Sequence, residues 1–212
     1  MGPSVWDFDA SRWPDDDCVA VGADLAPSTI VAAYRAGAFP MPDGRDLLWW
    51  SPMRRGILRP DDVHESRSLR RSMRRFTTTV DTAFTEVIDA CADPSRPGAW
   101  IDRRVRDAYV RLHSLGWAHS IEVRDADDGA LVGGLYGLSV GRLFAGESMF
   151  HRRTDASKAA MVHLAEVVGD GLVDVQWSTP HLASMGVVEI GRADYLDLLP
   201  SLVDDPGPTA WA

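Results

Sequence analysis

An amphipathic helix is the first element that the hydrophobic pattern predicts. Over residues 24–37 the apolar side chains recur at helical spacing, at Ile30, Val31 and Tyr34. Gly37 indicates the end of the helix, because glycine readily adopts the left-handed conformation that closes a helix. A short buried strand is predicted at residues 47–50, Leu-Leu-Trp-Trp, before a Ser-Pro pair.

The remaining N-terminal residues show no such pattern. We expect loops over residues 1–23 and turns over residues 40–46. Pro60 is the expected boundary of a small N-terminal α/β domain, residues 1–60. A larger domain would then span residues 61–204, followed by a flexible Pro/Asp/Gly-rich tail over residues 205–212.

Helical periodicity dominates the next part of the chain. The basic segment 66–75 is expected to be helical, residues 76–80 to form a strand, and residues 81–92 to form a helix capped by Asp81. A further helix over residues 102–116 carries apolar side chains on one face, at Val105, Ala108, Leu112 and Leu115.

The pattern changes after residue 120. Three apolar segments separated by turns predict an antiparallel meander, at residues 120–123, 131–138 and 142–150. Four elements are expected beyond it: a helix over 154–168 capped by Thr154, a strand over 172–177, a strand over 187–190 and a helix over 193–203. This order predicts an α+β fold with a mixed, largely antiparallel sheet.

Composition narrows the class of protein. The 212 residues are 45% hydrophobic and 25% charged, which is typical of a globular protein and excludes disordered and fibrous classes. No apolar run approaches the roughly 20 residues of a membrane span, and the N-terminal residues lack a signal-peptide pattern. We therefore expect a cytoplasmic protein without membrane contact and, because coiled-coil heptads are missing, a monomer.

Metal and nucleophile motifs are missing from the sequence. The two cysteines, Cys18 and Cys91, cannot form a disulfide framework or a cysteine-based zinc site. The six histidines lack metal-binding spacing, and neither a Gly-x-Ser-x-Gly elbow nor a P-loop is present. We expect no metal and no cofactor.

Arginines gather in one segment of a chain whose formal net charge is −9. The cluster consists of Arg67, Arg70, Arg71, Arg74 and Arg75. A codon-biased genome is the simpler explanation of the preference for arginine over lysine, of which Lys158 is the single example. The clustering nevertheless indicates phosphate contact with one nucleic-acid element.

A carboxylate stands in the apolar, glycine-rich segment 133–150. Glu147 would cost several kcal/mol to bury unpaired, so we expect a partner or a shifted pKa. A structural ion pair and a functional acid or base remain equal alternatives. Glycines in a strand indicate bulges or close approach of a ligand to the backbone, and this segment has them at Gly133, Gly134, Gly137 and Gly146.

Two polar residues share a face of the predicted strand 172–177. Asp174 and Gln176 are two residues apart, so their side chains point the same way and can orient one another. The alternative is a satisfied buried hydrogen bond without a role in chemistry.

Several ordered strings resemble one family. They are Gly-Ala-Asp-Leu (22–25), Tyr-Arg-Ala-Gly-Ala-Phe-Pro (34–40), Leu-Trp-Trp-Ser-Pro (48–52), Arg-Leu-His-Ser-Leu-Gly-Trp-Ala-His-Ser-Ile-Glu-Val (111–123), Leu-Val-Gly-Gly-Leu-Tyr-Gly (131–137), Leu-Phe-Ala-Gly-Glu-Ser-Met-Phe (143–150) and Ala-Ser-Lys (156–158). Together they resemble leucyl/phenylalanyl-tRNA–protein transferase over residues 20–200.

The resemblance implies a fold and a reaction. The fold is a small N-terminal domain followed by a domain similar to acyl-CoA N-acetyltransferases. The reaction moves Leu or Phe, with Met as an open alternative, from aminoacyl-tRNA to proteins that begin with Arg or Lys, and marks them for N-end-rule degradation.

The resemblance also implies roles for single residues. Glu147 and Gln176 match the functional polar residues of the family, and Asp174 matches a carboxylate that orients the glutamine. We favour Asp174 and Gln176 as a positioning pair, with Glu147 holding the attacking ammonium. The aminoacyl ester is already activated, so no serine or cysteine nucleophile is required.

Further residues would bind the substrates. Leu135, Phe144 and Met149 are candidates for the aminoacyl side-chain pocket, and Trp100 for stacking on the terminal adenosine of tRNA. The arginine cluster and Lys158 would contact tRNA phosphates. Three places depart from the family. Met41 replaces a tryptophan of the adenosine site, and Asp155 replaces an asparagine before Ala-Ser-Lys. Residues 177–181 read Trp-Ser-Thr-Pro-His where a Leu-Asn-Asp-His-like string is usual.

Two other functions compete with this one. An acyl-CoA-dependent N-acetyltransferase would need a glycine-rich pyrophosphate loop, but residues 151–155 read His-Arg-Arg-Thr-Asp. An inactive RNA-binding module would be indicated by loss of Glu147 or Gln176, and both are present.

Overall fold

The computed structural model describes residues 2–96 and 98–211. Over these residues the strands form a small sheet of order β1-β3-β2 and a larger sheet of order β10-β4-β9-β8-β7-β6-β5. The large sheet is antiparallel except for the parallel pair β8 and β9. The expected α+β fold with a mixed, largely antiparallel sheet is confirmed.

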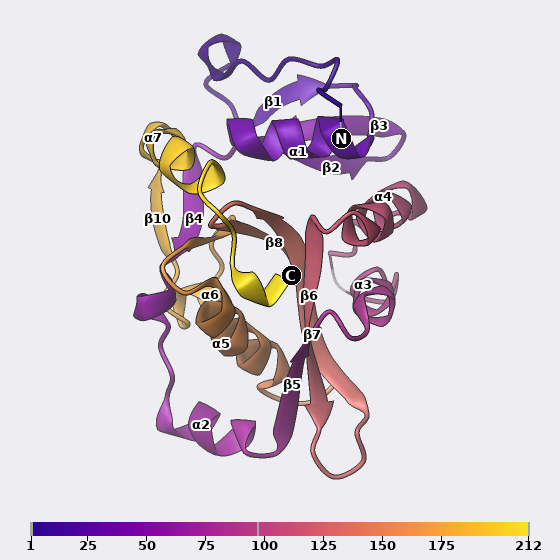
Figure 1. Ribbon diagram of the computed structural model, residues 1–212, viewed down its shortest axis with the longest axis vertical. Coiled ribbons are helices and arrows are strands. Elements are labelled where there is room, and N and C mark those ends of the chain that lie inside the picture. Colours follow the sequence, from indigo (N-terminus) through magenta and orange to yellow (C-terminus); the bar gives the residue numbers. More distant parts are fainter. Residues whose placement is uncertain (1, 97, 212) are drawn as a thin grey trace.

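The small sheet and α1 form the N-terminal unit at the top of Figure 1. Its elements are η1 (Ala10–Arg12), β1 (Cys18–Val21), α1 (Pro27–Ala36), β2 (Phe39–Asp43) and β3 (Asp46–Trp50). The predicted helix and the predicted strand at 47–50 are present. The expectation of loops and turns is wrong at β1 and β2: β2 contains two prolines, which are tolerated because β2 is an edge strand.

The larger unit begins before Pro60. β4 (Arg54–Leu58) lies between β10 and β9 in the large sheet, so this strand is part of the larger unit although it precedes the expected boundary. The elements that follow are η2 (Pro60–Asp62), α2 (Arg67–Met73), β5 (Phe76–Val80), α3 (Phe84–Cys91) and α4 (Arg103–Ser114).

The meander and the C-terminal elements complete the large sheet. They are β6 (Ala118–Asp125), β7 (Leu131–Val140), β8 (Leu143–His151), α5 (Ala156–Val168), β9 (Leu172–Gln176), α6 (Pro180–Ala183), β10 (Val188–Gly191), α7 (Arg192–Val203) and η3 (Thr209–Trp211). The two predicted caps are wrong. Asp81 accepts from the backbone of Ser120 instead, and the N-cap of α5 is Asp155 rather than Thr154.

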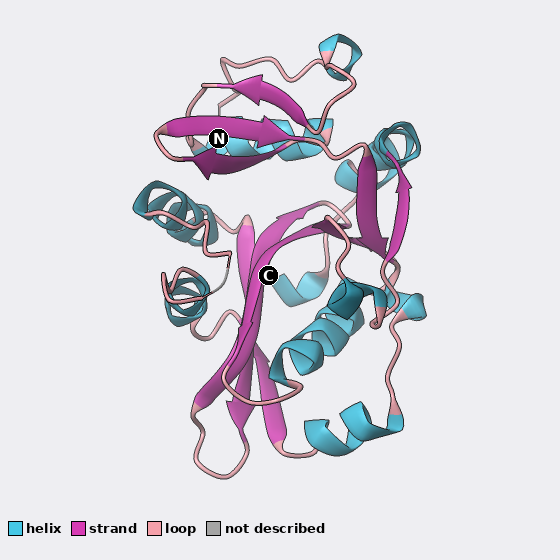
Figure 2. Ribbon diagram, turned by 180° about the vertical axis from the view of Figure 1, so that it is seen from behind, coloured by secondary structure: helices cyan, strands magenta, loops and turns pink. Residues whose placement is uncertain are grey.

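Helices cover both faces of the large sheet (Figures 1 and 2). α3 and α4 pack on one face and α5 on the other, and each side has its own apolar core. Two adjacent glycines of β7, Gly133 and Gly134, leave room for close packing against the sheet. A Cβ on Gly133 would lie 2.6 Å from Cβ of Ala156 in α5, and a Cβ on Gly134 would lie 2.7 Å from the carbonyl oxygen of Ile121. These two glycines therefore serve packing rather than a ligand.

The C-terminal residues 205–211 lie against the large unit, where a flexible tail was expected. The indole ring of Trp211 stacks on His119 at 4.4 Å and on Phe144 at 5.6 Å between ring centroids. His119 is held in turn by Asp81, whose carboxylate lies 2.7 Å from Nδ1. These contacts place Trp211 against β6 and β8.

Candidate active site

A cavity of about 280 Å³ opens where β8 and β9 separate. The parallel pairing of the two strands ends at Ala145 and Asp174, and no ladder pair joins them beyond that point. The wall is mainly apolar and comes from β7, β8, β9, α5 and α6, while Glu147 and Gln176 contribute polar atoms.

Glu147 is aimed into the site by a β-bulge. The ladder pairs Tyr136 with Ser148 and Gly137 with Gly146, so Glu147 is an extra residue with no opposite residue on β7. A bulge kinks the strand and redirects a side chain, and such bulges are common beside active sites. The expected use of Gly137 and Gly146 at a bulge is therefore confirmed.

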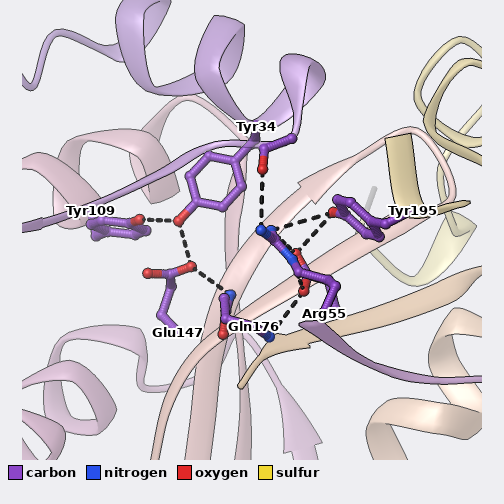
Figure 3. Close-up of polar contacts among 8 residues, drawn as sticks. Tyr34, Arg55, Tyr109, Glu147, Gln176 and Tyr195 are labelled. Atoms are coloured by element: carbon purple, nitrogen blue, oxygen red, sulfur yellow. Dashed lines mark hydrogen bonds and ion pairs between the residues drawn. The ribbon is translucent and has the colours of Figure 1, made fainter. Parts of the chain in front are cut away.

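Two tyrosines hold the Glu147 carboxylate (Figure 3). The hydroxyl of Tyr34 donates to Oε1 of Glu147 at 2.5 Å, and the hydroxyl of Tyr109 lies 2.7 Å from that of Tyr34. Because the proton of Tyr34 is used on Glu147, Tyr109 is the donor to Tyr34. The hydrogen bonds thus run in one direction, from α4 through α1 to β8.

The environment of Glu147 suits proton exchange near neutral pH. Burial raises the pKa of Glu147 to about 7, although the hydrogen bond from Tyr34 acts in the opposite direction. Within the described residues the Glu147 carboxylate forms no ion pair, which removes the structural ion-pair alternative. A carboxylate with such a pKa can exchange a proton near neutral pH.

Gln176 stands beside Glu147 at the end of β9. Its Nε2 donates to Oε1 of Glu147 at 3.5 Å (Figure 3). Its backbone has a φ of 60°, in the left-handed region that a non-glycine residue adopts at a cost of about 1–3 kcal/mol. Gln176 can keep this strained conformation only if the surrounding structure holds its backbone there.

Asp174 holds the backbone of Gln176 in this conformation. Its Oδ1 accepts from the backbone N–H of Gln176 at 2.9 Å. The sequence led us to expect that the two side chains orient one another; the structure instead joins the Asp174 carboxylate to the Gln176 main chain. Asp174 therefore acts on the strand end, and the Gln176 amide is left free to face Glu147.

Arg55 of β4 locks Asp174 in place. Nε lies 2.8 Å from Oδ1 and Nη2 lies 2.5 Å from Oδ2, and both side chains are at most 1% exposed. Tyr195 of α7 donates to Oδ2 at 2.9 Å. Burial lowers the pKa of Arg55, but Asp174, Tyr195 and Tyr34 together raise it by more, so the net shift is upward and the guanidinium stays charged.

The N-terminal unit completes the enclosure of Arg55. Nη1 donates to the carbonyl oxygen of Gly37 at 3.1 Å, and the guanidinium carbon lies 5.0 Å from the centre of the Phe39 ring. A bidentate, fully hydrogen-bonded pair of this kind is stable in the interior because every polar atom is satisfied.

Four residues of this network were missed in the sequence, namely Tyr34, Arg55, Tyr109 and Tyr195. Tyr34 has the spacing of a core residue, and Arg55 lies in an Arg-Arg-Gly string without strand periodicity. Each finds its partner more than twenty positions away in the chain, so no local pattern reports the contact.

Two of the three pocket candidates line the cavity. Leu135 of β7 and Met149 of β8 are cross-strand partners and both form part of the wall. Phe144 is absent from the lining; its ring stacks on Trp211 instead. Other apolar wall residues come from α5 and β9: Met161, Leu164, Val173 and Val175.

The two adenosine candidates lie on different elements. Met41 is half-buried in β2, and its carbonyl oxygen accepts from Nε1 of Trp50 at 3.1 Å. Trp100 is half-buried just before α4. Arg104 of α4 donates to the carbonyl oxygen of Gly44 at 3.0 Å, which fastens the β2–β3 turn to α4.

The phosphate candidates share the opposite end of the molecule. All five arginines of the cluster are exposed, on α2 and the two residues after it. Ser72 of α2 donates to Asp155 at 2.8 Å, and Nζ of Lys158 lies 3.4 Å from the same carboxylate. The arginine cluster and Lys158 therefore lie together, with Asp155 offsetting part of their charge.

Two searches of the described residues complete this survey. Among residues 2–96 and 98–211 there is no group of three or more His, Cys, Asp or Glu side chains placed to hold a metal ion. No helix in the same ranges has the length and apolar character needed to cross a membrane.

Comparisons with known proteins agree on one family. Residues 57–200 match the family profile described as leucyl/phenylalanyl-tRNA protein transferase, and residues 23–53 match the profile of its N-terminal domain. The leucyl/phenylalanyl-tRNA–protein transferase of Aromatoleum aromaticum is 48% identical over 206 residues, covering 93% of this chain and 86% of that protein. The enzyme of the same name from Stutzerimonas stutzeri is 49% identical over 201 residues, covering 91% and 88%.

Solved structures show weaker similarity. A functionally unknown conserved protein from Staphylococcus epidermidis gives a TM-score of 0.46 at 9% identity, covering 65% of this chain and 57% of that chain. A GCN5-related N-acetyltransferase from Sphaerobacter thermophilus gives a TM-score of 0.37 at 14% identity, covering 78% and 54%.

Proposed function

The chain belongs to the leucyl/phenylalanyl-tRNA protein transferase family, and from this premise we propose that it moves Leu or Phe from aminoacyl-tRNA to the α-amine of proteins that begin with Arg or Lys. The transfer marks those proteins for N-end-rule degradation. The proposal includes a monomeric enzyme that works in the cytoplasm, where aminoacyl-tRNA is made.

The observation that carries this function is an acid–amide pair at the wall of an apolar cavity. Glu147 and Gln176 stand 3.5 Å apart, between Oε1 and Nε2, where β8 and β9 part. The cavity of about 280 Å³ can take an apolar side chain that is unbranched at Cβ, with Leu135 and Met149 in its wall. An ester carbonyl attached to such a side chain would then lie near the pair.

The reaction needs a proton acceptor but no nucleophilic side chain, because the acceptor's own α-amine attacks the ester. The α-ammonium of the acceptor loses a proton to Glu147, and the free amine attacks the ester carbonyl carbon. An amide bond forms as the attacking nitrogen gives up its second proton to solvent, the bond from that carbon to the ribose oxygen breaks, and the proton held by Glu147 passes to the leaving ribose oxygen. Because its pKa is about 7, Glu147 can both accept and return this proton.

The other residues of the site position the reacting groups. The amide of Gln176 donates toward the developing negative charge, and Asp174 with Arg55 keeps the strained backbone of Gln176 in place. Trp100 and Met41 would hold the terminal adenosine. Because Met41 stands where the family has a tryptophan, the adenosine would pack against one aromatic ring and one methionine side chain instead of two aromatic rings. The exposed arginines of α2 and Lys158 would contact phosphates.

The test follows label from tRNA to peptide. Radiolabelled Leu-tRNA is mixed with a peptide beginning with Arg, and the wild type is compared with Glu147→Gln, Gln176→Ala and the control Glu86→Gln, an exposed change on α3. We expect transfer by the wild type and the control, and a loss of about 100-fold or more in the two site variants. A peptide with a blocked N-terminus should receive no label.

Two results would contradict the proposal. Transfer that does not depend on an N-terminal Arg or Lys would overturn the acceptor. Acetylation of the same peptide from acetyl-CoA, without transfer from Leu-tRNA, would favour the acyl-CoA-dependent activity instead.

A further inference from the structure

The residue after Gln176 is fixed by a contact from the N-terminal part of the chain. Nε1 of Trp177 donates to Oδ2 of Asp17 at 3.1 Å. Oδ1 of Asp17 accepts from the backbone N–H of Met53 at 2.7 Å, so each carboxylate oxygen has its own donor. Asp17 stands just before β1, and its contact with Trp177 spans 160 positions of the sequence.

Aromatic packing restrains the same indole ring. The Trp177 ring lies edge-on to Phe39 of β2 and to Trp50 of β3, with 5.2 Å and 5.9 Å between ring centroids. The N-terminal unit therefore holds both the plane of this ring and its one hydrogen-bond donor.

The main chain is crowded at the same point. Gly56 of β4 is the ladder partner of Gln176, and a Cβ on Gly56 would lie 3.0 Å from the backbone nitrogen of Ser178 and 3.2 Å from the carbonyl carbon of Trp177. Gln176 is the last residue of β9, and Asp174 holds its strained backbone from one side. Trp177 is attached on the other side, so a movement of Trp177 displaces Gln176.

The N-terminal loop has other anchors. The carbonyl oxygen of Pro14 accepts from Nη1 of Arg192 at 2.9 Å, and the carbonyl oxygen of Asp17 accepts from the backbone N–H of Ser51 at 2.8 Å. Neither bond uses the Asp17 side chain. Removal of this carboxylate therefore leaves the loop attached and releases the indole of Trp177.

We propose that Asp17 is a positioning residue of the transfer reaction, which holds the side-chain amide of Gln176 against Glu147 through the indole of Trp177. The inference rests on the proposed function and adds the N-terminal loop to its reaction centre. Asp17 and Trp177 are not among the residues that line the aminoacyl cavity, so their loss should slow the chemical step rather than weaken donor binding.

A double-mutant cycle tests the route from Asp17 to Gln176. Asp17→Ala and Trp177→Phe each remove the contact, and the second keeps an aromatic ring in place. Each should lower kcat for leucine transfer to an Arg-peptide by about tenfold, with KM for Leu-tRNA within about twofold of wild type. The double variant should be no slower than Trp177→Phe alone, because Asp17 then has no indole to hold.

Gln176 offers a second readout, because it is the only glutamine of the chain and asparagine is absent. Its side chain therefore gives the single carboxamide pair in a nitrogen–proton correlation spectrum of the isotope-labelled protein. Asp17→Ala, which leaves Gln176 and its neighbours in the sequence intact, should shift this pair. The same change in the Trp177→Phe background should not.

Trp6→Phe is the matched control. Nε1 of Trp6 donates to Oδ2 of Asp24 at 2.9 Å, a contact of the same kind within the N-terminal unit. Its loss should change neither kcat nor the Gln176 signals. Urea unfolding shows whether each variant is folded, and if Trp177→Phe is not, Asp17→Ala decides through kcat and the Gln176 signals together.

The outcomes separate this inference from the function on which it rests. If the wild type transfers leucine and kcat stays within about twofold in both single variants, the role of Asp17 is refuted while the proposed function stands. Equal losses from Asp17→Ala with and without the Trp177 indole, or a fall in kcat with unshifted Gln176 signals, refute it as well. If the wild type transfers no leucine, the proposed function fails and this inference fails with it.

Discussion

The hydroxyl of Tyr34 lies 2.5 Å from Oε1 of Glu147, and this contact joins α1 of the N-terminal unit to the bulge in β8. The pKa of Glu147, about 7, is therefore lowered by a hydrogen bond from Tyr34, a residue outside the large sheet. Arg55 repeats the arrangement, because it binds Asp174 of β9 and the carbonyl of Gly37 together. The site is built across both units.

Removal of the Tyr34 hydroxyl should shift the pH dependence of the reaction. Its hydrogen bond stabilises the Glu147 carboxylate, so Tyr34→Phe should raise the pKa of Glu147 above about 7. The acidic limb of kcat/KM against pH should move to higher pH by about half a unit to one unit. Tyr136→Phe is the control, since the described residues offer its hydroxyl no partner, and the limb should stay in place.

Glu147 should also make stability depend on pH. Its folded pKa of about 7 exceeds the ordinary value of 4.5, so the native state favours the protonated form. This stabilising contribution is complete below 4.5 and is lost as pH rises through about 7. Relative to Glu147→Gln, the wild type should therefore lose about 2–3 kcal/mol between pH 4 and pH 8, measured by urea unfolding. Glu86→Gln keeps Glu147 and should follow the wild-type trend; if it followed the trend of Glu147→Gln, this assignment would be contradicted.

Variants of the Arg55–Asp174 pair should affect the stability of the protein and its transfer activity differently. Arg55→Met leaves a buried carboxylate without its partner and should cost about 3–5 kcal/mol of unfolding free energy. The double variant Arg55→Met/Asp174→Leu should recover most of that stability. Transfer should remain low in the double variant, because the backbone N–H of Gln176 has lost its acceptor. Full recovery of transfer would show that Asp174 does not position Gln176.

The arginines of α2 should set the salt dependence of tRNA binding. Arg71→Gln/Arg74→Gln should weaken binding, and the slope of log K against log salt should decrease by about one for each phosphate contact removed. Filter binding across a salt series measures both quantities. Arg12→Gln, an exposed change in the N-terminal unit, should leave the slope unchanged; equal slopes in all variants would remove α2 from the interface.

Local patterns predicted the elements that local forces form. The apolar spacing of α1 and α4 and the apolar segments of the meander, separated by turns, were visible in the sequence because each is a local pattern. Glu147 was visible for a different reason: a single carboxylate in an apolar strand requires an explanation.

Elements that depend on distant partners were not visible. β4 contains Arg54, Arg55 and Gly56, which do not favour a strand, and it forms because Asp174 and β9 complete it. Gly56 is required there, since a Cβ at this position would lie 3.0 Å from the backbone nitrogen of Ser178. The partnership of Asp174 with a main-chain N–H likewise follows from the strained φ of Gln176, which no spacing rule reports.

The position of β4 between β9 and β10 has a consequence for the order in which the molecule is made. β4 leaves the ribosome long before either neighbour, since both lie near the end of the chain. The Arg55 side chain therefore stays solvated, without its partner Asp174, until nearly the whole polypeptide has been translated. The strand end at Gln176 and the buried Arg55 would be assembled in one late step, so a chain released early would carry the arginine-rich α2 without the network around Asp174.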